Sequence, residues 1–209
     1  IGRIGCQVSG DGDWGVYNSA YISDATGKVT VAKPGEFKTM LEKHKTYFLD
    51  GQVPDTSNRM IYVTDRIYPS LEEVPQKSIK GPSFLPNWFF AYTYPQNVNK
   101  DGILIPGNQD EHNRVLPLPV FPTPFYETIL CTLIFLFLWA IRKSISIPLI
   151  MFGIYLLLNG IERFMIELIR VNKTYSFMGL HPSQAEIIAI LLSLSGLVLI
   201  FIAKRKKSD

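Results

Sequence analysis

The sequence predicts an all-α polytopic membrane protein with about three C-terminal transmembrane helices, the end of an earlier one, and an extramembrane α+β cap. The mean hydropathy of +0.13 and the 47% of hydrophobic residues look ordinary, but they average two unlike halves. Residues 1–120 are polar and rich in proline and aromatic side chains, whereas three long apolar runs follow from Phe125 onward. Such runs are typical of membrane-spanning helices. The net charge of +3 is small, and we expect no nucleic-acid partner.

Each apolar run is long enough to cross the hydrocarbon core of a bilayer. The runs cover residues 125–141, 147–169 and 185–203. They hold about 17 to 23 residues each, and a helix that rises about 1.5 Å per residue then matches a core of about 30 Å. Pro148 opens the second run at a position that suits the first turn of a helix.

Basic residues predict the orientation of these runs. Arg142 and Lys143 follow the first run, and the cluster 204–207 follows the third. Lys and Arg gather on the cytoplasmic side of membrane spans, so we expect a cytoplasmic C-terminus. The joint 170–184 and the whole region before Phe125 are then expected on the external face.

The sequence divides into three predicted regions. Residues 1–15 have the pattern of a helix end followed by a glycine-rich loop, residues 16–120 form an external cap, and residues 121–209 hold the three spans and a C-terminal tail. Because the chain begins with Ile1 and shows no signal-peptide pattern, we expect it to be the C-terminal part of a longer product, inactive alone.

Short-range patterns predict mixed structure in the cap. Residues 27–32 and 60–65 alternate like short strands, and a helix with one apolar face is expected to begin near Glu36. Aromatic side chains crowd the proline-punctuated stretch 81–99. That composition fits either the level of the lipid headgroups or ordinary packing of the cap.

Neither cysteine belongs to a recognisable site. Cys6 and Cys131 lack a CxxC neighbour and a histidine at metal-ligand spacing. We therefore expect no disulfide framework and no metal site. We also expect no cofactor.

A polar stripe crosses the end of the second apolar run. Asn159, Arg163, Glu167 and Arg170 recur at intervals of four, four and three residues, so a helix places them on one face, with Glu162 about a third of a turn away. Ionisable groups in spans usually face a bundle interior or a wet cavity, because each costs about 2.5 to 3.5 kcal/mol near the bilayer centre.

Two interpretations of this stripe stay open. In the first, Arg163 and Glu167 form a pair one turn apart, while Glu162 and Arg170 extend to the interface. In the second, the arginines hold an anionic headgroup and Glu167 orients them. Phosphate suits arginine, because its planar fork makes two parallel hydrogen bonds.

Four motifs resemble the prolipoprotein diacylglyceryl transferase family. "GRIGCQVSGDGDWG" (2–15) resembles the signature G-R-x-G-N-x-x-N-G-E-x-x-G, and "FPTPFYE" (121–127) resembles the family's Pro-Ser-Gln-Leu-Tyr-Glu opening of a span. "RFMIELIR" (163–170) resembles an Arg-x-x-x-Glu-x-x-Arg stripe, and "FMGLHPSQ" (177–184) resembles the Ser-Met-Gly-Gln turn before the last helix. They occur in the family's order, with the cap as a large insert.

The resemblance implies a reaction and a location. The diacylglyceryl group of phosphatidylglycerol would pass to the lipobox cysteine of a preprolipoprotein, on the periplasmic face of the bacterial inner membrane. Arg3 and Arg163 would stabilise the phosphate leaving group, and Glu167 would position Arg163, so these three residues are the implied catalytic set. The implied substrate-binding residues are Arg3, Gly5, Asp11, Gly15, Arg163 and Arg170.

The chain departs from the family pattern at several positions. Cys6 and Ser9 stand where the family has asparagine, and either Asp11 or Asp13 takes the place of its glutamate. The family's His-Gly-Gly motif, whose histidine is a candidate general base, has no counterpart at the three histidines of this chain: His44, His112 and His181. The alternative is a non-enzymatic membrane protein that binds anionic lipid, or a protein partner through its cap.

Overall fold

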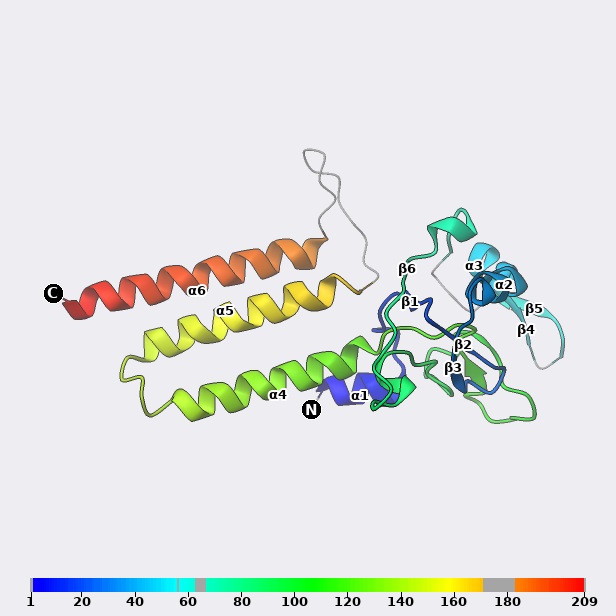
Figure 1. The fold of residues 1–209 in the computed structure, drawn as a ribbon, viewed down its shortest axis with the longest axis horizontal. Coiled ribbons are helices and arrows are strands. Elements are labelled where there is room, and N and C mark those ends of the chain that lie inside the picture. The colour runs from blue at the N-terminus through cyan, green and yellow to red at the C-terminus, as the bar shows by residue number, and fades with distance from the viewer. Residues whose placement is uncertain (1, 56, 63–66, 171–182, 209) are drawn as a thin grey trace. The chain divides into compact units, whose positions relative to one another are not determined.

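The fold consists of two units. The computed structural model describes residues 2–55, 57–62, 67–170 and 183–208. The chain divides into a cap unit, Ile1–Pro124, and a helical unit, Phe125–Asp209 (Figure 1). Residues 1–15 group with the cap unit, and we keep the finer three-way division as a prediction.

Three long apolar helices form the C-terminal part of the chain. They are α4 (Thr123–Ile141), α5 (Pro148–Glu167) and α6 (Gln184–Ser208). Each is long and apolar enough to cross a membrane, α6 over Gln184–Arg205. The prediction of a multi-pass membrane protein is therefore confirmed, with helix bounds that differ from the predicted runs by a few residues.

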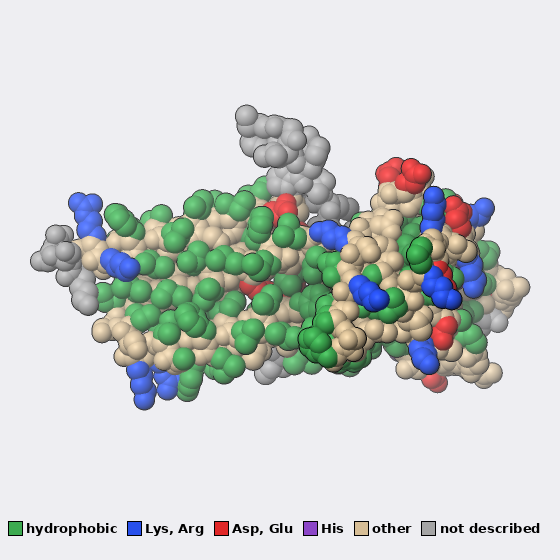
Figure 2. Space-filling model, viewed as in Figure 1, with side chains coloured by type: hydrophobic (Ala, Val, Ile, Leu, Met, Phe, Trp, Pro, Cys, Tyr) green, Lys and Arg blue, Asp and Glu red, His purple; other side chains and the backbone are tan. Residues whose placement is uncertain are grey.

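The surface of these helices fits a lipid environment. Figure 2 shows hydrophobic side chains over most of their visible face, and residues such as Phe137, Leu191 and Phe201 are at least half exposed. The C-terminal ends of α4 and α6 lie at the same end of the helical unit (Figure 1), and Lys and Arg side chains gather there (Figure 2). The charge pattern behind the predicted orientation is thus present in three dimensions, while the sidedness itself stays a prediction.

Small residues let α5 and α6 approach closely. A Cβ atom added to Gly160 would lie 2.6 Å from the Ala189 carbonyl oxygen, and one added to Gly196 would lie 2.5 Å from the Gly153 carbonyl oxygen. Side chains are therefore excluded at these crossing points. Small residues that allow close backbone contact are typical of helix pairs in membranes.

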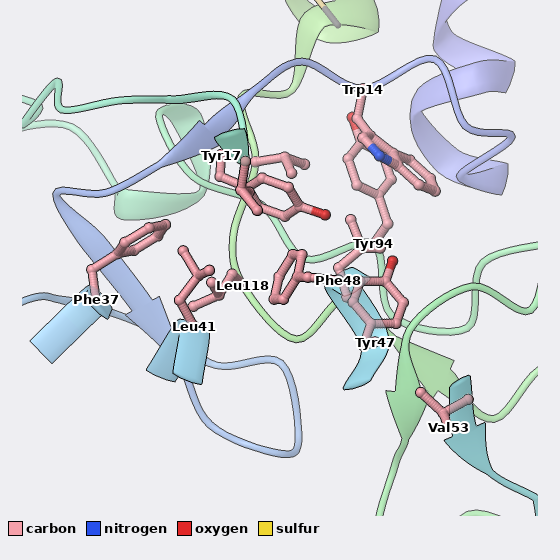
Figure 3. Packing of buried hydrophobic residues seen from close by; sticks show 12 residues of the cluster. Trp14, Tyr17, Phe37, Leu41, Tyr47, Phe48, Val53, Tyr94 and Leu118 are labelled. Atoms are coloured by element: carbon pink, nitrogen blue, oxygen red, sulfur yellow. The ribbon is translucent and has the colours of Figure 1, made fainter. Parts of the chain in front are cut away.

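The cap unit is built around an aromatic core (Figure 3). Its buried members come from the whole length of the unit: Trp14, Tyr17, Phe37, Leu41, Tyr47, Phe48, Val53, Val74, Tyr94, Leu116, Leu118 and Val120. The Phe48 ring packs edge-on against Tyr17 and Tyr47, at centroid distances of 5.3 and 5.0 Å. Such edge-to-face pairs add to the free energy of burial.

Short strands and helices surround this core, which confirms the predicted α+β cap. The helical elements are α1 (Gly2–Ser9), α2 (Glu36–Lys43), α3 (Lys45–Asp50), η1 (Leu71–Glu73) and η2 (Asn87–Phe89). The strands are β1 (Tyr17–Asn18), β2 (Tyr21–Ser23), β3 (Val29–Val31), β4 (Gln52–Pro54), β5 (Met60–Tyr62), β6 (Gln76–Lys77), β7 (Ile103–Leu104) and β8 (Arg114–Val115). β1 pairs with β6 in parallel, and the pairs β2–β3, β4–β5 and β7–β8 are antiparallel.

The helix expected near Glu36 is two helices. It begins as predicted, but His44 has φ −106° and ψ 24°, which interrupts the helix between α2 and α3. Gly51, with φ 63°, then ends α3 in the left-handed region that favours glycine. The predicted apolar face nevertheless points into the core, because Phe37 and Phe48 are both buried.

Close packing of α5 against α6 gives the first prediction. Replacing Gly160 by valine should push the helices apart and lower the free energy of unfolding by about 1–3 kcal/mol, because overpacking forces a backbone shift. Thermal unfolding in detergent measures this change. The matched control is Ala140→Val, at an exposed position of α4, which should change the midpoint little. Equal losses in both variants would contradict the packing described above.

Candidate functional site

A buried carboxylate joins two arginines in the helical unit. Glu127, in the second turn of α4, has a side chain only 5% exposed. Its Oε1 atom lies 3.5 Å from Nη1 of Arg163 in α5 and 3.6 Å from Nη1 of Arg170. We call Glu127, Arg163, Glu167, Arg170 and Ser183 the arginine cluster. It contains three of the polar residues that the sequence places on one stripe.

Local structure explains how the two arginines reach one carboxylate. Arg163 lies on α5, one turn before the helix ends at Glu167. Arg170 follows the helix end, and its N–H donates to the Glu167 carbonyl oxygen at 3.2 Å. The chain thus turns after α5, which brings Arg170 to the same side as Arg163 without a continuous helix.

Glu167 is tied to the start of α6. Its Oε1 accepts a hydrogen bond of 2.6 Å from the Ser183 hydroxyl, and both residues are buried. The Ser183 backbone N–H donates to Oε2 of Glu186, and the Glu186 N–H donates to Oγ of Ser183. This reciprocal pair is a capping box, which satisfies donors at the N-terminus of α6.

These contacts differ from the pairing that the first interpretation of the stripe expects. Within the described residues, Arg163 forms its ion pair with Glu127, while Glu167 bonds to Ser183. In place of the expected pair between Arg163 and Glu167, Arg163 contacts α4 and Glu167 contacts the residue that precedes α6. Asn159 donates to the Tyr155 carbonyl oxygen of its own helix at 2.8 Å, so it stands outside the cluster.

Arg163 has the exposure and the donors to bind an anion. Its side chain is 30% exposed, and its contact with Glu127 occupies one of the five N–H donors of a guanidinium. The remaining donors form a planar fork that fits two oxygens of a phosphate. An anion on the exposed side of Arg163 would thus meet a guanidinium that is oriented by a buried carboxylate.

A second candidate cluster lies in the glycine-rich loop of the cap unit. Arg3, on α1, forms an ion pair with Asp13. The Thr123 hydroxyl donates to the Asp13 carbonyl oxygen at 2.6 Å, which ties the loop to the first residue of α4. Asp11 is exposed. Of the two aspartates left open by the sequence, Asp13 thus forms an ion pair with Arg3 in this structure.

Contacts of Trp14 and of the end of α1 with Tyr94 also hold the glycine-rich loop in place. Trp14 is buried and packs against Tyr94 at a ring-centroid distance of 5.1 Å. The Tyr94 hydroxyl donates to Oε1 of Gln7, in α1, at 2.8 Å. Gly10 has φ 62°, and a Cβ atom there would lie 2.7 Å from Cβ of Asn97. Glycine is therefore required where the chain leaves α1.

The two glycines of the predicted substrate-binding set have different surroundings. Gly5 is exposed, and a Cβ atom added to it would meet no atom of the described residues within 4 Å, so among these residues the helix face around it is open. Gly15 is buried, and its N–H donates to the Phe121 carbonyl oxygen at 2.9 Å. Gly5 thus leaves room for a ligand, whereas Gly15 fixes the loop to the chain before α4.

Three side chains that could bind a metal cation lie close together on α1 and in the loop that follows it. One ligand atom each from Cys6, Asp11 and Asp13 lies within 4.8 Å of the others. Asp13 already pairs with Arg3, however, and the guanidinium charge opposes a metal cation at that position. Three ligands beside an arginine do not favour a metal centre.

Neither of the two histidines that the structure describes belongs to the arginine cluster or to the Arg3–Asp13 pair. Burial lowers the pKa of His44, helped by the charge of Lys43, and this residue stands between α2 and α3 in the cap unit. His112 is partly buried in the loop before β8. His181 lies outside the described residues.

Sequence reasoning missed Glu127 and Ser183 as members of the site. A signal existed for each: Glu127 is a carboxylate in an apolar span and ends the "FPTPFYE" motif, and Ser183 begins an S-x-x-E pattern. Neither signal predicts the partner, because both contacts join segments far apart in the sequence.

Comparison with known proteins gives the family. The model of the family described as prolipoprotein diacylglyceryl transferase matches residues 1–202, nearly the whole chain. Neither the curated proteins nor the solved structures gave a significant match. The matched range contains both the arginine cluster and the Arg3–Asp13 pair.

The shared carboxylate gives the second prediction. Glu127→Gln keeps the size of the side chain but removes the charge that faces Arg163 and Arg170, and it should lower the free energy of unfolding by about 3 kcal/mol. Chemical or thermal unfolding in detergent measures the loss. Glu111→Gln, which alters an exposed ion pair with Lys100, serves as control and should have little effect. A Glu127→Gln protein as stable as the control would show that the ion pairs are not formed.

Proposed function

The chain belongs to the prolipoprotein diacylglyceryl transferase family, and from this premise we propose that phosphatidylglycerol is its donor and a lipobox cysteine its acceptor. Membership implies transfer of a diacylglyceryl group to prolipoproteins during lipoprotein maturation, in a multi-pass membrane protein. The arginine cluster carries the proposal of an anionic phospholipid donor. In this proposal the cap and the site face the periplasm, and the C-terminus faces the cytoplasm.

The proposed chemistry is a displacement at a glyceryl carbon. The cysteine thiolate forms a bond to that carbon, and the bond between the carbon and the phosphate oxygen breaks. The electron pair leaves with the phosphate, so glycerol phosphate is released. The thiol proton goes to a general base, and none of His44, His112 and His181 matches the family's motif for that base.

Charge develops on the departing phosphate, and fixed donors in a water-poor site stabilise it. Arg163 is proposed as the donor that binds this phosphate, because it combines partial exposure with a guanidinium oriented by Glu127. Glu127 is then a positioning residue. Glu167 holds α5 to the start of α6 through Ser183, and Arg170, which shares Glu127, contributes a second positive charge.

The opening loop is proposed to contribute a second cation. Arg3, paired with Asp13, would bind donor or acceptor beside the open face at Gly5. This contact with Arg3 supports Asp13 as the residue that takes the place of the glutamate in the family signature. Asp11 would reach the substrate from the exposed side of the loop, and Gly15 holds the loop in place.

Exchange of one arginine gives the third prediction. Arg163→Lys keeps the charge but loses the planar fork, so transfer of labelled diacylglyceryl to a lipobox peptide should fall by at least about 100-fold in membranes. The same exchange at Arg142, exposed at the far end of α4, is the matched control and should leave transfer unchanged. Both variants should accumulate to the same level on immunoblots.

Two results would overturn this assignment. Unchanged transfer by Arg163→Lys would make Arg163 a structural charge. If the full-length wild-type protein transfers nothing although it is inserted and stable, a non-enzymatic lipid-binding or partner-binding role is the better interpretation.

The donor headgroup gives the fourth prediction. Liposomes that contain labelled phosphatidylglycerol should support transfer with release of glycerol phosphate, because the leaving group carries its negative charge to the arginines without a competing ammonium. Phosphatidylethanolamine, whose ammonium would meet the guanidinium groups, should support little transfer. Equal rates from both lipids would contradict phosphatidylglycerol as the specific donor.

A further inference from the structure

A closed loop in the cap unit presents exposed aromatic side chains. This loop, residues 79–90, is held at its base by Asn18, which is fully buried. The Asn18 side-chain amide donates to the carbonyl oxygens of Ile79 and Phe90 at 2.8 and 3.0 Å, and its Oδ1 accepts from the Ile79 N–H at 3.2 Å. One side chain thus joins both ends of the segment, as in an Ω-loop. We call it the aromatic loop.

The interior of the aromatic loop is also ordered by its own contacts. The Leu85 N–H donates to the Pro82 carbonyl oxygen, and the Phe90 N–H donates to the Asn87 carbonyl oxygen. A Cβ atom at Gly81 would overlap the Phe90 ring, so residues near the two ends of the loop are in direct contact. The Gly81 N–H donates to the Tyr21 hydroxyl at 2.9 Å, which fixes the loop to β2.

Large apolar side chains stand on this fixed loop. Phe84 is 81% exposed, Trp88 is 46% exposed and Ile79 is 44% exposed. Trp88 packs against Phe89 at a ring-centroid distance of 5.7 Å, and Lys80, in the same loop, is exposed. A flexible loop could fold such side chains inward, but an ordered one keeps them outside. Exposed apolar groups that are held in place mark an interaction surface.

The base of the loop lies next to the residues that precede α4. The Asn18 N–H donates to the Pro119 carbonyl oxygen at 2.9 Å, and Tyr92 and Val120 exchange two backbone hydrogen bonds of 2.9 Å. Val120 is three residues before Thr123, where the membrane-spanning helix α4 begins. The three residues from Val120 to Thr123 span at most about 10 Å. The polar layer on each side of a bilayer is about 5–7 Å thick, so the base of the loop is within reach of this layer.

We propose that the aromatic loop inserts Phe84 and Trp88 into the interfacial layer of the membrane and anchors the cap there. Tryptophan is enriched at this depth, because its ring is apolar while its N–H bonds to the headgroups. Lys80 adds attraction to anionic lipids. A lipid surface is the occupant that the contact between the base of the loop and the residues just before α4 favours, and a peptide partner is the outcome that the test must separate from it.

The test measures the depth of Trp88 in the membrane-embedded protein. Wild type and Trp88→Phe are reconstituted in nanodiscs of phosphatidylcholine and phosphatidylglycerol, and the difference between their emission spectra isolates Trp88. Phosphatidylcholine brominated near the top of its acyl chains should remove most of this signal, and aqueous acrylamide should remove little. The control introduces Tyr62→Trp into the Trp88→Phe background. Tyr62 is 73% exposed on β5, and β4 and β5 lie far from α1 within the cap unit (Figure 1).

Each outcome decides the proposal. Quenching of Trp88 by brominated lipid, together with quenching of the Tyr62→Trp protein by acrylamide alone, supports it. Quenching of Trp88 by acrylamide and not by brominated lipid overturns it. Protection of Trp88 from acrylamide only when a lipobox peptide is added also overturns it, because the surface would then belong to the peptide. Since Trp88→Phe preserves an aromatic side chain, loss of folding is not expected to obscure the reading.

Discussion

One carboxylate, that of Glu127, organises the charged end of the helical unit. It is buried, and its Oε1 atom faces guanidinium groups on α5 and on the turn after it. Desolvation makes such a group costly unless opposite charges surround it, so α4, α5 and the turn must all be in place together. The ion pairs thus tie these three segments to one another, in an arrangement in which the Arg163 guanidinium faces Glu127.

The opposite side of α5 is fixed by different forces. Glycines at 153, 160 and 196 bring its backbone against α6, and Glu167 bonds to the serine that caps α6. Arg163 thus stands on a helix that is held by α4 through charge and by α6 through packing and a hydrogen bond. This rigidity suits a group that must stabilise a developing charge, since donors oriented in advance need no rearrangement during the reaction.

Properties that depend on composition or local spacing could be predicted from the sequence. Run length gave the three spans, and helical periodicity placed Arg163 and Glu167 on one face of α5. Alternation located β3 and β5, although β3 is shorter than the predicted 27–32; residues 63–65 of the second predicted strand lie outside the described residues. The sequence could not show that Arg163 pairs with Glu127, because the two residues lie on different helices and are 36 positions apart in the sequence. It also could not show the break at His44, since the apolar face of α2 and α3 continues in register across it.

The two ends of the predicted cap segment lie side by side. The Gly15 N–H donates to the Phe121 carbonyl oxygen at 2.9 Å, and the Phe121 N–H donates to the Val16 carbonyl oxygen at 3.0 Å. An insertion whose ends lie side by side adds a folded body without changing the path of the flanking segments. The core of the cap draws on Trp14 before this junction and Val120 just inside it, so folding of the cap also closes the junction. The same closure ties the loop that carries Asp13 to Thr123. The cap therefore helps to hold the Arg3 loop in the conformation in which Asp13 meets Arg3.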